Sequence, residues 1–276
     1  MKMFNKVVII GTGLIGGSLG LALKKKQLAG QVIGLSRKKA NANLAKKCKA
    51  IDIVGKSLEV VNNADLIILA TPVDIILEIA PKIAKKIKSS CLVIDVGSSK
   101  EMIVTSLDKI IPNFVGCHPL AGSEKRGAAN IQPDIFCGCT CIITPSAKTK
   151  QLALNKIKLF WKKIGSKVVV LSPKKHDQAL AVTSHLPHAL AFALISSVPE
   201  QFLGLSAGGL KDITRIASSD PGLWSQIFLS NRSNLLSAFS SLQNKINALK
   251  IAIKNKNKKL LTKILAASKN KREKLG

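Results

Sequence analysis

Acidic residues are scarce in this chain: 15 Asp and Glu stand against 43 Lys and Arg, and the formal net charge is +28. A charge of that size attracts nucleic acids and anionic membranes. However, aromatic residues make up only 4% of the chain and are not interleaved with the lysines. Neither a zinc-finger spacing nor a helix-turn-helix pattern is present. We therefore expect a solvated lysine face that reflects composition bias, and no nucleic-acid partner.

Sequence patterns for export and for membrane insertion are also missing. No signal peptide precedes the first expected strand, and no apolar run reaches the length of a membrane span. These absences predict a cytoplasmic protein without a membrane partner. In that reducing compartment the cysteines are expected to be free thiols.

The six cysteines lack the spacing of a metal site. Cys137, Cys139 and Cys141 alternate, so in a strand they would share one face. Zinc sites usually use a CxxC spacing, and no histidine lies near these three residues in the sequence. We interpret the three cysteines as small core residues and expect no metal site.

Hydrophobic residues make up 46% of the 276 residues, enough for one large or two medium domains with a proper core. The first part alternates strand and helix patterns, which is typical of a doubly wound sheet. We predict an α/β Rossmann-type dinucleotide-binding domain over residues 1–172. Its expected strands are 6–10, 31–35, 66–70, 92–96, 114–117, 140–143 and 167–171, and its expected helices are 15–26, 39–47, 74–87, 101–110 and 149–164.

Strand patterns disappear after residue 172, and helical patterns dominate to the end of the chain. Residues 181–195 are apolar over much of the helix circumference, and residues 235–253 and 260–267 carry apolar stripes opposite lysines. We predict an all-α substrate and dimerisation domain over residues 173–276, which packs against a second copy. The expected breaks between its helices are Pro187, Pro199, Gly208 and Gly209, and Pro221 and Gly222.

The most informative stretch is VVIIGTGLIGGS, over residues 7–18. It places a GxGxxG motif between a strand and a helix at the start of a βαβ unit, which is the context of a dinucleotide site. Gly11 would allow the tight turn, Gly13 the approach of a pyrophosphate, and Gly16 close helix packing. The phosphates would meet the N–H groups at the helix start. The predicted cofactor-binding residues are Gly11, Thr12, Gly13, Leu14, Ile15, Gly16, Ser36, Arg37 and Thr71.

The choice of cofactor depends on the end of the second strand. NAD enzymes usually carry Asp or Glu there, to bind the ribose hydroxyls. This chain has Ser36, followed by Arg37, Lys38 and Lys39. A hydroxyl and three cations suit a 2′-phosphate. We therefore predict NADP, with NAD as the alternative, since these cations would also suit a solvated loop of a lysine-rich protein.

Polar residues follow two more strands at the edge where ligands of such sheets bind. DVGSSK ends one strand and GCHPLAGSEKRG the other, so Ser98 and His118 should face the nicotinamide. Further polar clusters lie in the helical part, in HDQALAVTSHLPH and DITRIASSDPGLW. All four histidines fall within these segments. The strand-end position of His118 favours a functional role, whereas a helix-capping role stays open for His176.

Taken together, GTGLIGGS, DVGSSK, GCHPLAGSEKRG, HDQALAVTSHLPH and DITRIASSDPGLW resemble the prephenate/arogenate dehydrogenases of tyrosine biosynthesis. The resemblance covers about residues 6–240. It implies an NAD(P)-dependent oxidoreductase that decarboxylates a cyclohexadienyl substrate and dimerises through its helical domain. It also implies catalytic roles for His118 and Ser98. The residues that it implies for substrate binding are Arg215, Ser184, His185 and His188.

The chemistry of the substrate agrees with these roles. A neutral His118 can accept the proton of the C4 hydroxyl as hydride leaves for the nicotinamide, and Ser98 can orient that hydroxyl. Decarboxylation then aromatises the ring without a metal. Arg215 offers a two-pronged contact to a carboxylate, and its alternative role is an ion pair with Asp212. Two roles stay open for Glu124: it could contact a cationic group such as a substrate amine, or it could be an exposed carboxylate at the rim of the site.

Several functions stay open at this stage. We predict arogenate as the substrate, because NADP use is associated with arogenate in the family. Prephenate is the alternative, since no motif separates the two. A 3-hydroxyacid dehydrogenase is more remote, because the lysine motif of that design is absent from the domain junction. A basic nucleic-acid-binding protein would instead bind DNA in a salt-dependent way without turnover.

Overall fold

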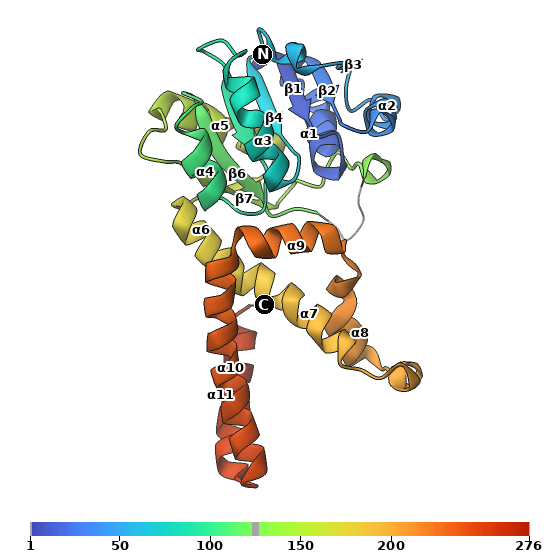
Figure 1. The fold of residues 1–276 in the computed structure, drawn as a ribbon, viewed down its shortest axis with the longest axis vertical. Coiled ribbons are helices and arrows are strands. Elements are labelled where there is room, and N and C mark those ends of the chain that lie inside the picture. The colour runs from blue at the N-terminus through green and yellow to red at the C-terminus, as the bar shows by residue number, and fades with distance from the viewer. Residues whose placement is uncertain (1, 123–126, 276) are drawn as a thin grey trace. The chain divides into compact units, whose positions relative to one another are not determined.

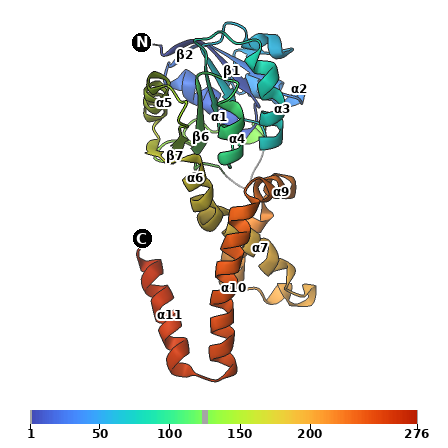
Figure 2. The same ribbon diagram turned by 60° about the vertical axis from the view of Figure 1, so that its left-hand side comes forward.

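The structure, a computed structural model, describes residues 2–122 and 127–275. The chain divides into two compact units, Met1–Asn231 and Arg232–Gly276. The first unit contains a sheet with its helices and a further helical segment, and the second consists of two long helices (Figures 1 and 2). Glu124 lies outside the described residues.

An eight-stranded sheet forms the centre of the first unit, in the order β3-β2-β1-β4-β5-β6-β7-β8. All neighbours are parallel except β6 and β7, which are antiparallel. Because β1 pairs with both β2 and β4, the strand order reverses at β1, where ligands of such sheets bind. The strands are β1 Phe4–Ile10, β2 Ala29–Leu35, β3 Ile53–Val54, β4 Leu66–Leu69, β5 Leu92–Asp95, β6 Phe114–Pro119, β7 Thr140–Thr144 and β8 Lys167–Val170.

Helices connect the strands and then continue beyond the sheet. The α/β fold, its expected strands and its expected helices are confirmed to within about one helical turn at each end. The two-residue strand β3 was not expected from the sequence. The helices of the first unit are α1 Leu14–Lys25, α2 Lys39–Lys47, α3 Val73–Ala84, α4 Glu101–Leu107, α5 Gln151–Ile164, α6 Pro173–Leu180, α7 Leu186–Ser196, α8 Gly208–Thr214 and α9 Pro221–Ser230.

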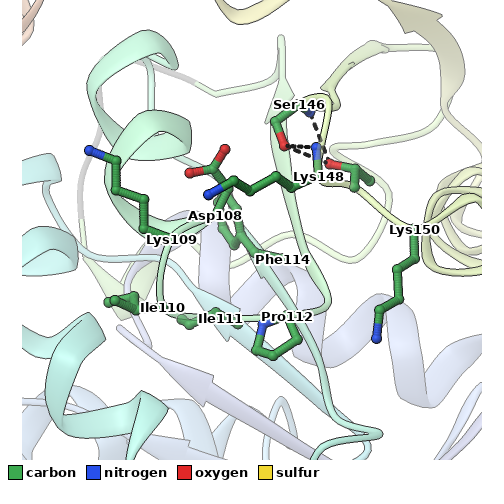
Figure 3. A pocket seen from close by; sticks show the side chains of 10 residues that line it. Asp108, Lys109, Ile110, Ile111, Pro112, Phe114, Ser146, Lys148 and Lys150 are labelled. Atoms are coloured by element: carbon green, nitrogen blue, oxygen red, sulfur yellow. Dashed lines mark hydrogen bonds between the residues drawn. The ribbon is translucent and has the colours of Figure 1, made fainter.

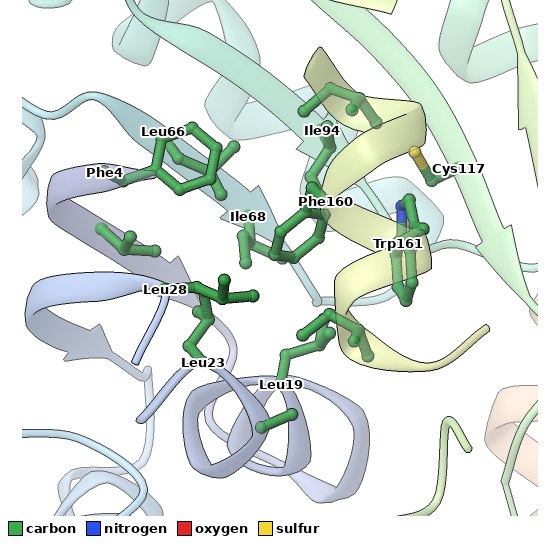
Figure 4. Close-up of a cluster of buried hydrophobic side chains, with 14 of the residues drawn as sticks. Phe4, Leu19, Leu23, Leu28, Leu66, Ile68, Ile94, Cys117, Phe160 and Trp161 are labelled. Atoms are coloured by element: carbon green, nitrogen blue, oxygen red, sulfur yellow. The ribbon is translucent and has the colours of Figure 1, made fainter. Parts of the chain in front are cut away.

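The core consists of two apolar layers, one on each face of the sheet. Along β1, Val7 and Ile9 belong to one layer and Val8 and Ile10 to the other, because successive strand side chains alternate. The first layer is completed by α1 and α5, and the second by α3 and α4. Figure 4 shows the first layer, where side chains of α1 and α5 meet those of β4 and β5. Coverage of both faces explains why these strands are apolar throughout.

Beyond β8 the chain forms one helical segment, Pro173–Ser196, in which a π-helical turn over Ala181–His185 joins α6 to α7. The Ser172 hydroxyl caps its start by accepting a hydrogen bond from the Lys175 N–H at 3.2 Å. The expected break at Pro187 is wrong. Proline lacks an N–H and crowds the carbonyl four residues earlier, and the wide π turn just before Pro187 accommodates both effects.

The same segment corrects a second expectation. Among the described residues, Pro173–Ser196 is the one helix that is long and apolar enough to span a membrane by length and composition. The mean hydropathy of its most apolar 18-residue stretch is 1.4. The statement that no apolar run reaches that length is therefore wrong. A single helix of this kind is weak evidence for a membrane span, since core helices of other proteins meet the same criterion. Here its first turns carry buried charged and polar side chains, described below.

The second unit is a helical hairpin of α10 Arg232–Lys254 and α11 Lys258–Glu273, so both helical predictions for this region are confirmed. The Asn257 side chain caps α11 by accepting a hydrogen bond from the Leu260 N–H at 3.0 Å. The hairpin leaves apolar side chains exposed, among them Ile253 at 61% and Leu265 at 54%. Such residues suit a surface that another chain covers.

All six cysteines are free thiols. Cys141 is buried in β7, and Cys139 is half-buried just before that strand. The interpretation of all three neighbouring cysteines as core residues is wrong for Cys137, which is exposed. The physical reason is that β7 begins only at Thr140, so Cys137 lies in the preceding turn and not on the strand face.

Candidate active site

The glycine loop between β1 and α1 has the geometry that its sequence predicts. Gly11 has a φ of +101°, and a Cβ there would lie 2.4 Å from the Ala70 carbonyl oxygen. A Cβ on Gly16 would lie 1.9 Å from the Gly11 oxygen, so only glycine allows this close approach of helix and strand. A Cβ on Gly13 would meet nothing within 4 Å, which leaves the backbone open to a ligand. Leu14 and Ile15 form the first turn of α1.

Buried hydroxyls around this loop fit a polar ligand. Within the described residues, the oxygen atoms of Thr12, Thr71 and Ser99 are buried without a hydrogen-bond partner. The three residues follow β1, β4 and β5, the strands at the reversal of the sheet. Buried hydroxyls normally find partners. A dinucleotide on the glycine loop would bring phosphate, ribose and amide groups to this edge, and the loop, helix start and hydroxyls fit such a cofactor.

The end of β2 has the basic character that the sequence indicates. Ser36 is half-exposed directly after β2, and Arg37 is exposed beside it. Lys38 precedes α2, which begins at Lys39. A group bound at this strand end therefore meets a hydroxyl and cations, and no carboxylate occupies residues 36–39.

His118 belongs to a buried polar group that we call the edge cluster: His118, His176 and Asp177. His118 lies near the carboxyl end of β6, and its Nδ1 is 2.9 Å from Nε2 of His176. Nδ1 of His176 in turn lies 2.7 Å from Oδ1 of Asp177. His176 and Asp177 are 0% and 1% exposed, whereas His118 is half-buried. The cluster thus runs from the interior to the sheet edge.

Asp177 also caps α4. Its Oδ1 accepts from the Lys100 N–H at 2.8 Å and its Oδ2 from the Glu101 N–H at 2.9 Å. Two otherwise unpaired N–H groups at the start of α4 are thereby satisfied. The Lys100 ammonium forms a fully buried ion pair with Asp95, at the end of β5. Together these contacts fix both ends of the segment 96–100 that carries Ser98.

Burial keeps these histidines neutral. The pKa of His118 lies well below its usual value, first because the ring is desolvated and then because His176, Lys100 and His185 disfavour its cationic form. Burial also lowers the pKa of His176, although the Asp177 carboxylate acts in the opposite direction. A neutral imidazole can accept a proton, so His118 has the protonation state of a general base near neutral pH.

A second group, the helix cluster, comprises His185, His188 and Trp224. The His188 ring stacks on Trp224 with centroids 3.5 Å apart, and its Nδ1 lies 3.1 Å from the Ser184 carbonyl oxygen. Nδ1 of His185 accepts from the Asn231 amide at 3.1 Å, and burial lowers the pKa of His185 to about 4. The same Asn231 amide donates to the Asp177 carbonyl at 2.7 Å, so it joins the two clusters.

The remaining predicted residues lie as follows. Ser98 is half-buried after β5, the strand next to β6, and the hydrogen bond of the His118 ring goes to His176 instead of Ser98. Arg215 begins a 3-10 helix, Arg215–Ser218, that packs against α7, and its charge contributes to the lowered pKa of His188. The structure thus brings His118, His176 and Ser98 to one edge, and Arg215 close to the helix cluster.

Sequence reasoning left some of this site undecided or unnoticed. The capping role left open for His176 is performed by Ser172, and the His176 ring contacts His118 instead. The adjacent His and Asp in the sequence were the available indication of this pair. Asn231 had no such indication, because its contacts to Asp177 and His185 join segments far apart in the chain.

The cavity drawn in Figure 3 is not part of this site. It has a volume of about 350 Å³ and lies between the loop that precedes β6 and the loop that precedes α5. Phe114 begins β6, whereas His118 lies near its other end, so the cavity is at the opposite edge of the sheet. Its lining includes the flexible side chains of Lys109, Lys148 and Lys150.

Fold and site define the class of an oxidoreductase that uses a nicotinamide dinucleotide. The comparisons with known proteins identify the family. The model of the prephenate dehydrogenase nucleotide-binding domain matches residues 19–170, and that of the prephenate dehydrogenase dimerization domain matches residues 172–267. The chain therefore belongs to the prephenate dehydrogenase family, as the sequence resemblance predicts.

Individual members of the family are similar to this chain over nearly its whole length. The prephenate dehydrogenase of Bacillus subtilis is 34% identical over 99% of this chain and 76% of its own length. The crystal structure of the A. aeolicus prephenate dehydrogenase with hydroxyphenyl propionate and NAD+ has a TM-score of 0.93 and 35% identity, covering 99% of this chain and 98% of its own. Synechocystis arogenate dehydrogenase has a TM-score of 0.86 and 26% identity, covering 98% of this chain and 100% of its own.

Proposed function

We propose that this chain oxidises and decarboxylates a cyclohexadienyl acid, with His118 as the general base. The observation that carries the proposal is the neutral, half-buried His118 ring, which lies at the same carboxyl edge of the sheet as the glycine loop that fits a dinucleotide. His118 would accept the proton of the ring hydroxyl, and Ser98 would orient that hydroxyl. A bound nicotinamide would supply the hydride acceptor. Loss of carbon dioxide then leaves an aromatic ring.

Substrate binding is assigned to the helical side of the site. Arg215 would hold a substrate carboxylate, because a guanidinium offers two parallel donors to that group. His185, His188 and Ser184 would shape the pocket beside it. The position of Arg215 near His188 supports this assignment, since the charge of Arg215 acts on that ring.

Two substrates compete for this site. Prephenate is favoured by the relatives, because the two prephenate dehydrogenases are 34% and 35% identical and the arogenate dehydrogenase 26%. Arogenate is favoured by the basic turn after β2, because that turn supports NADP as the cofactor and NADP use is associated with arogenate in the family. The family supports either enzyme reaction over a 3-hydroxyacid dehydrogenase or a nucleic-acid-binding protein.

The cofactor is proposed to be NADP, with NAD as the competing candidate. Ser36, Arg37 and the lysines beside them support NADP, since they offer a hydroxyl and cations where an acidic residue would repel a 2′-phosphate. The NAD+ in the A. aeolicus complex supports the competing choice.

One experiment tests substrate and cofactor together. Initial rates are measured with prephenate and with arogenate, each with NAD and with NADP, and His118→Asn serves as the control for contaminating activity. We expect turnover in at least one combination, with higher kcat/KM for NADP than for NAD. Turnover of neither substrate with either cofactor would overturn the proposed function.

We also propose a cytoplasmic homodimer divided into domains at residues 1–172 and 173–276. The dimerization-domain match over residues 172–267 supports both the division and the dimer. Exposed apolar side chains in the helical region add support, for example Val182 at 53% and Phe202 at 51%. Free cysteines suit a reducing compartment. Light scattering at micromolar protein should give about twice the chain mass of 29.4 kDa, and an active monomer would contradict the dimer.

A further inference from the structure

A histidine acting as a base must present the correct ring nitrogen, and one nitrogen of His118 is already engaged. Nδ1 of His118 is 2.9 Å from Nε2 of His176, within hydrogen-bond distance. One of these two nitrogens must carry a proton and the other a lone pair. Which one carries it decides whether Nε2 of His118 is basic or already protonated.

Asp177 settles the position of the proton on His176. Its Oδ1 lies 2.7 Å from Nδ1 of His176, and both carboxylate oxygens already accept N–H groups from Lys100 and Glu101. A carboxylate only accepts hydrogen bonds, so Nδ1 of His176 is the donor. Burial lowers the pKa of His176, so the neutral ring has no second proton. Nε2 of His176 therefore holds a lone pair and accepts from the Nδ1–H of His118.

We propose that His176, held by Asp177, is a positioning residue that keeps the proton of neutral His118 on Nδ1 and leaves Nε2 as its basic atom. The proposal rests on the proposed function of His118 and names the atom that takes the substrate proton. It follows from the juxtaposition of three segments: the end of β6, the first turns of α6 and the start of α4. Burial makes His118 neutral but does not choose its tautomer. The tautomer matters for catalysis, because the wrong one has no lone pair where the substrate proton arrives.

The arrangement is rigid as well as directional. His176 is 0% exposed, and the Asp177 carbonyl is held at 2.7 Å by the Asn231 amide. Both carboxylate oxygens and the main-chain carbonyl oxygen of Asp177 are therefore hydrogen-bonded. Tilting the His118 ring would break its 2.9 Å contact to His176.

Two substitutions of His176 separate its contact to His118 from its contact to Asp177. His176→Gln places an amide oxygen near the position of Nε2, so it preserves an acceptor for His118 but not the donor to Asp177. His176→Asn places its amide near the position of Nδ1, so it preserves the contact to Asp177 and removes the acceptor. We expect kcat to fall about 10- to 100-fold in the Asn variant, with KM nearly unchanged, and the Gln variant to retain most of the activity.

Gln178→Asn is the matched control, because it shortens an exposed side chain on the same helix. It should leave kcat and KM at their wild-type values. Thermal melts of all three variants check that the helix still folds. The split between Gln and Asn at position 176 is the decisive comparison, because a purely structural role would favour the variant that keeps the Asp177 contact.

A spectroscopic measurement tests the tautomer without turnover. The chain has only 4 histidines, so the ring nitrogens can be assigned by single substitutions in two-bond proton–nitrogen NMR spectra of the full-length protein. In the wild type, His118 should show a protonated Nδ1 and an unprotonated Nε2. The Gln variant should keep this pattern, and the Asn variant should show exchange between both tautomers.

The outcomes distinguish this proposal from the proposed function. A wild-type His118 protonated at Nε2 would overturn it, and so would equal kcat values for the Gln and Asn variants. If the wild type turns over neither prephenate nor arogenate, the proposed function fails, while the NMR pattern still reports on the tautomer by itself.

Discussion

The edge cluster and the helix cluster both fix histidine rings, but they do so with different partners. In the edge cluster a carboxylate anchors the chain of contacts, and the outer ring, His118, lies at the sheet edge. In the helix cluster a carbonyl oxygen and an aromatic face hold His188, and an amide holds His185. Both kinds of contact fix tautomers, because a carbonyl only accepts from His188 and an amide N–H only donates to His185. The clusters differ because in the edge cluster one ring is hydrogen-bonded to a second ring and then to a carboxylate.

From this difference we expect the two clusters to have different roles in the reaction. The edge cluster is suited to moving a proton, because its rings are hydrogen-bonded to one another and to a carboxylate that accepts a proton donor. The helix cluster is suited to shaping a pocket, with the Arg215 charge close to His188. Changes in the first should therefore act on kcat, and changes in the second on KM. Substitutions at His118 and Arg215 test that division, and two further predictions with smaller expected effects concern the cofactor site and stability.

Replacing His118 by Asn should lower kcat by about two to four orders of magnitude, as expected for the loss of a general base. The Asn amide can still donate to His176, so the edge cluster stays hydrogen-bonded and only Nε2 is lost. Cofactor affinity should be retained, because the glycine loop is untouched, and a dinucleotide titration followed by fluorescence checks this. A variant with wild-type kcat would contradict the role of His118.

Replacing Arg215 by Ala should act mainly on KM. The loss of a charge-assisted contact to a carboxylate costs about 2–4 kcal/mol, or roughly 30- to 700-fold in KM. Lys211→Ala, which removes another exposed cation from the neighbouring helix α8, is the control and should change KM little. If Arg215→Ala instead lowers the melting temperature and leaves KM unchanged, Arg215 has a structural role.

Replacing Ser36 by Asp should reverse the cofactor preference without touching either cluster. A carboxylate beside a 2′-phosphate costs about 1–3 kcal/mol, so the ratio of kcat/KM for NADP over NAD should fall roughly 5- to 150-fold. Ser89→Asp, an exposed site before β5 at the opposite edge of the sheet, controls for the added charge. Equal use of both cofactors by the wild type would contradict the NADP assignment.

The smallest effect concerns stability and the helix cluster. The pKa of His185 is about 4 in the folded chain, against an ordinary value of 6.5. Between those values the unfolded chain binds the additional proton, so the free energy of unfolding falls as the pH decreases from 6.5 to 4. The expected loss is on the order of 1–3 kcal/mol. Denaturant titrations at several pH values measure it.

His185→Asn supplies the control for this stability prediction. The Asn carbonyl can accept from the Asn231 amide in place of Nδ1, and the side chain does not titrate in this range. The variant should therefore show a weaker pH dependence of unfolding than the wild type. An unchanged pH dependence would mean that other groups control stability in this range.

Much of the sheet domain could be predicted from its sequence. The alternation of apolar strands and amphipathic helices indicated the strand and helix order, and the glycine spacing located the cofactor loop. Local rules succeed there because strand apolarity and glycine φ angles are properties of short segments. In the sheet domain they failed at Cys137, because the strand begins later than its pattern indicates. In the helical segment they failed at Pro187, because the preceding π turn accommodates the proline.

What the sequence alone determined is the class of fold, the dinucleotide loop, the family and the residue types available for catalysis. Only the tertiary structure placed Nδ1 of His118 against His176 and the Asp177 carboxylate against the start of α4. Those contacts join residues separated by 58 and 77 positions in the chain. No local pattern encodes such pairings, because they arise when β6, α4 and α6 pack together, and it is this packing that sets the charge and the proton positions of the histidines.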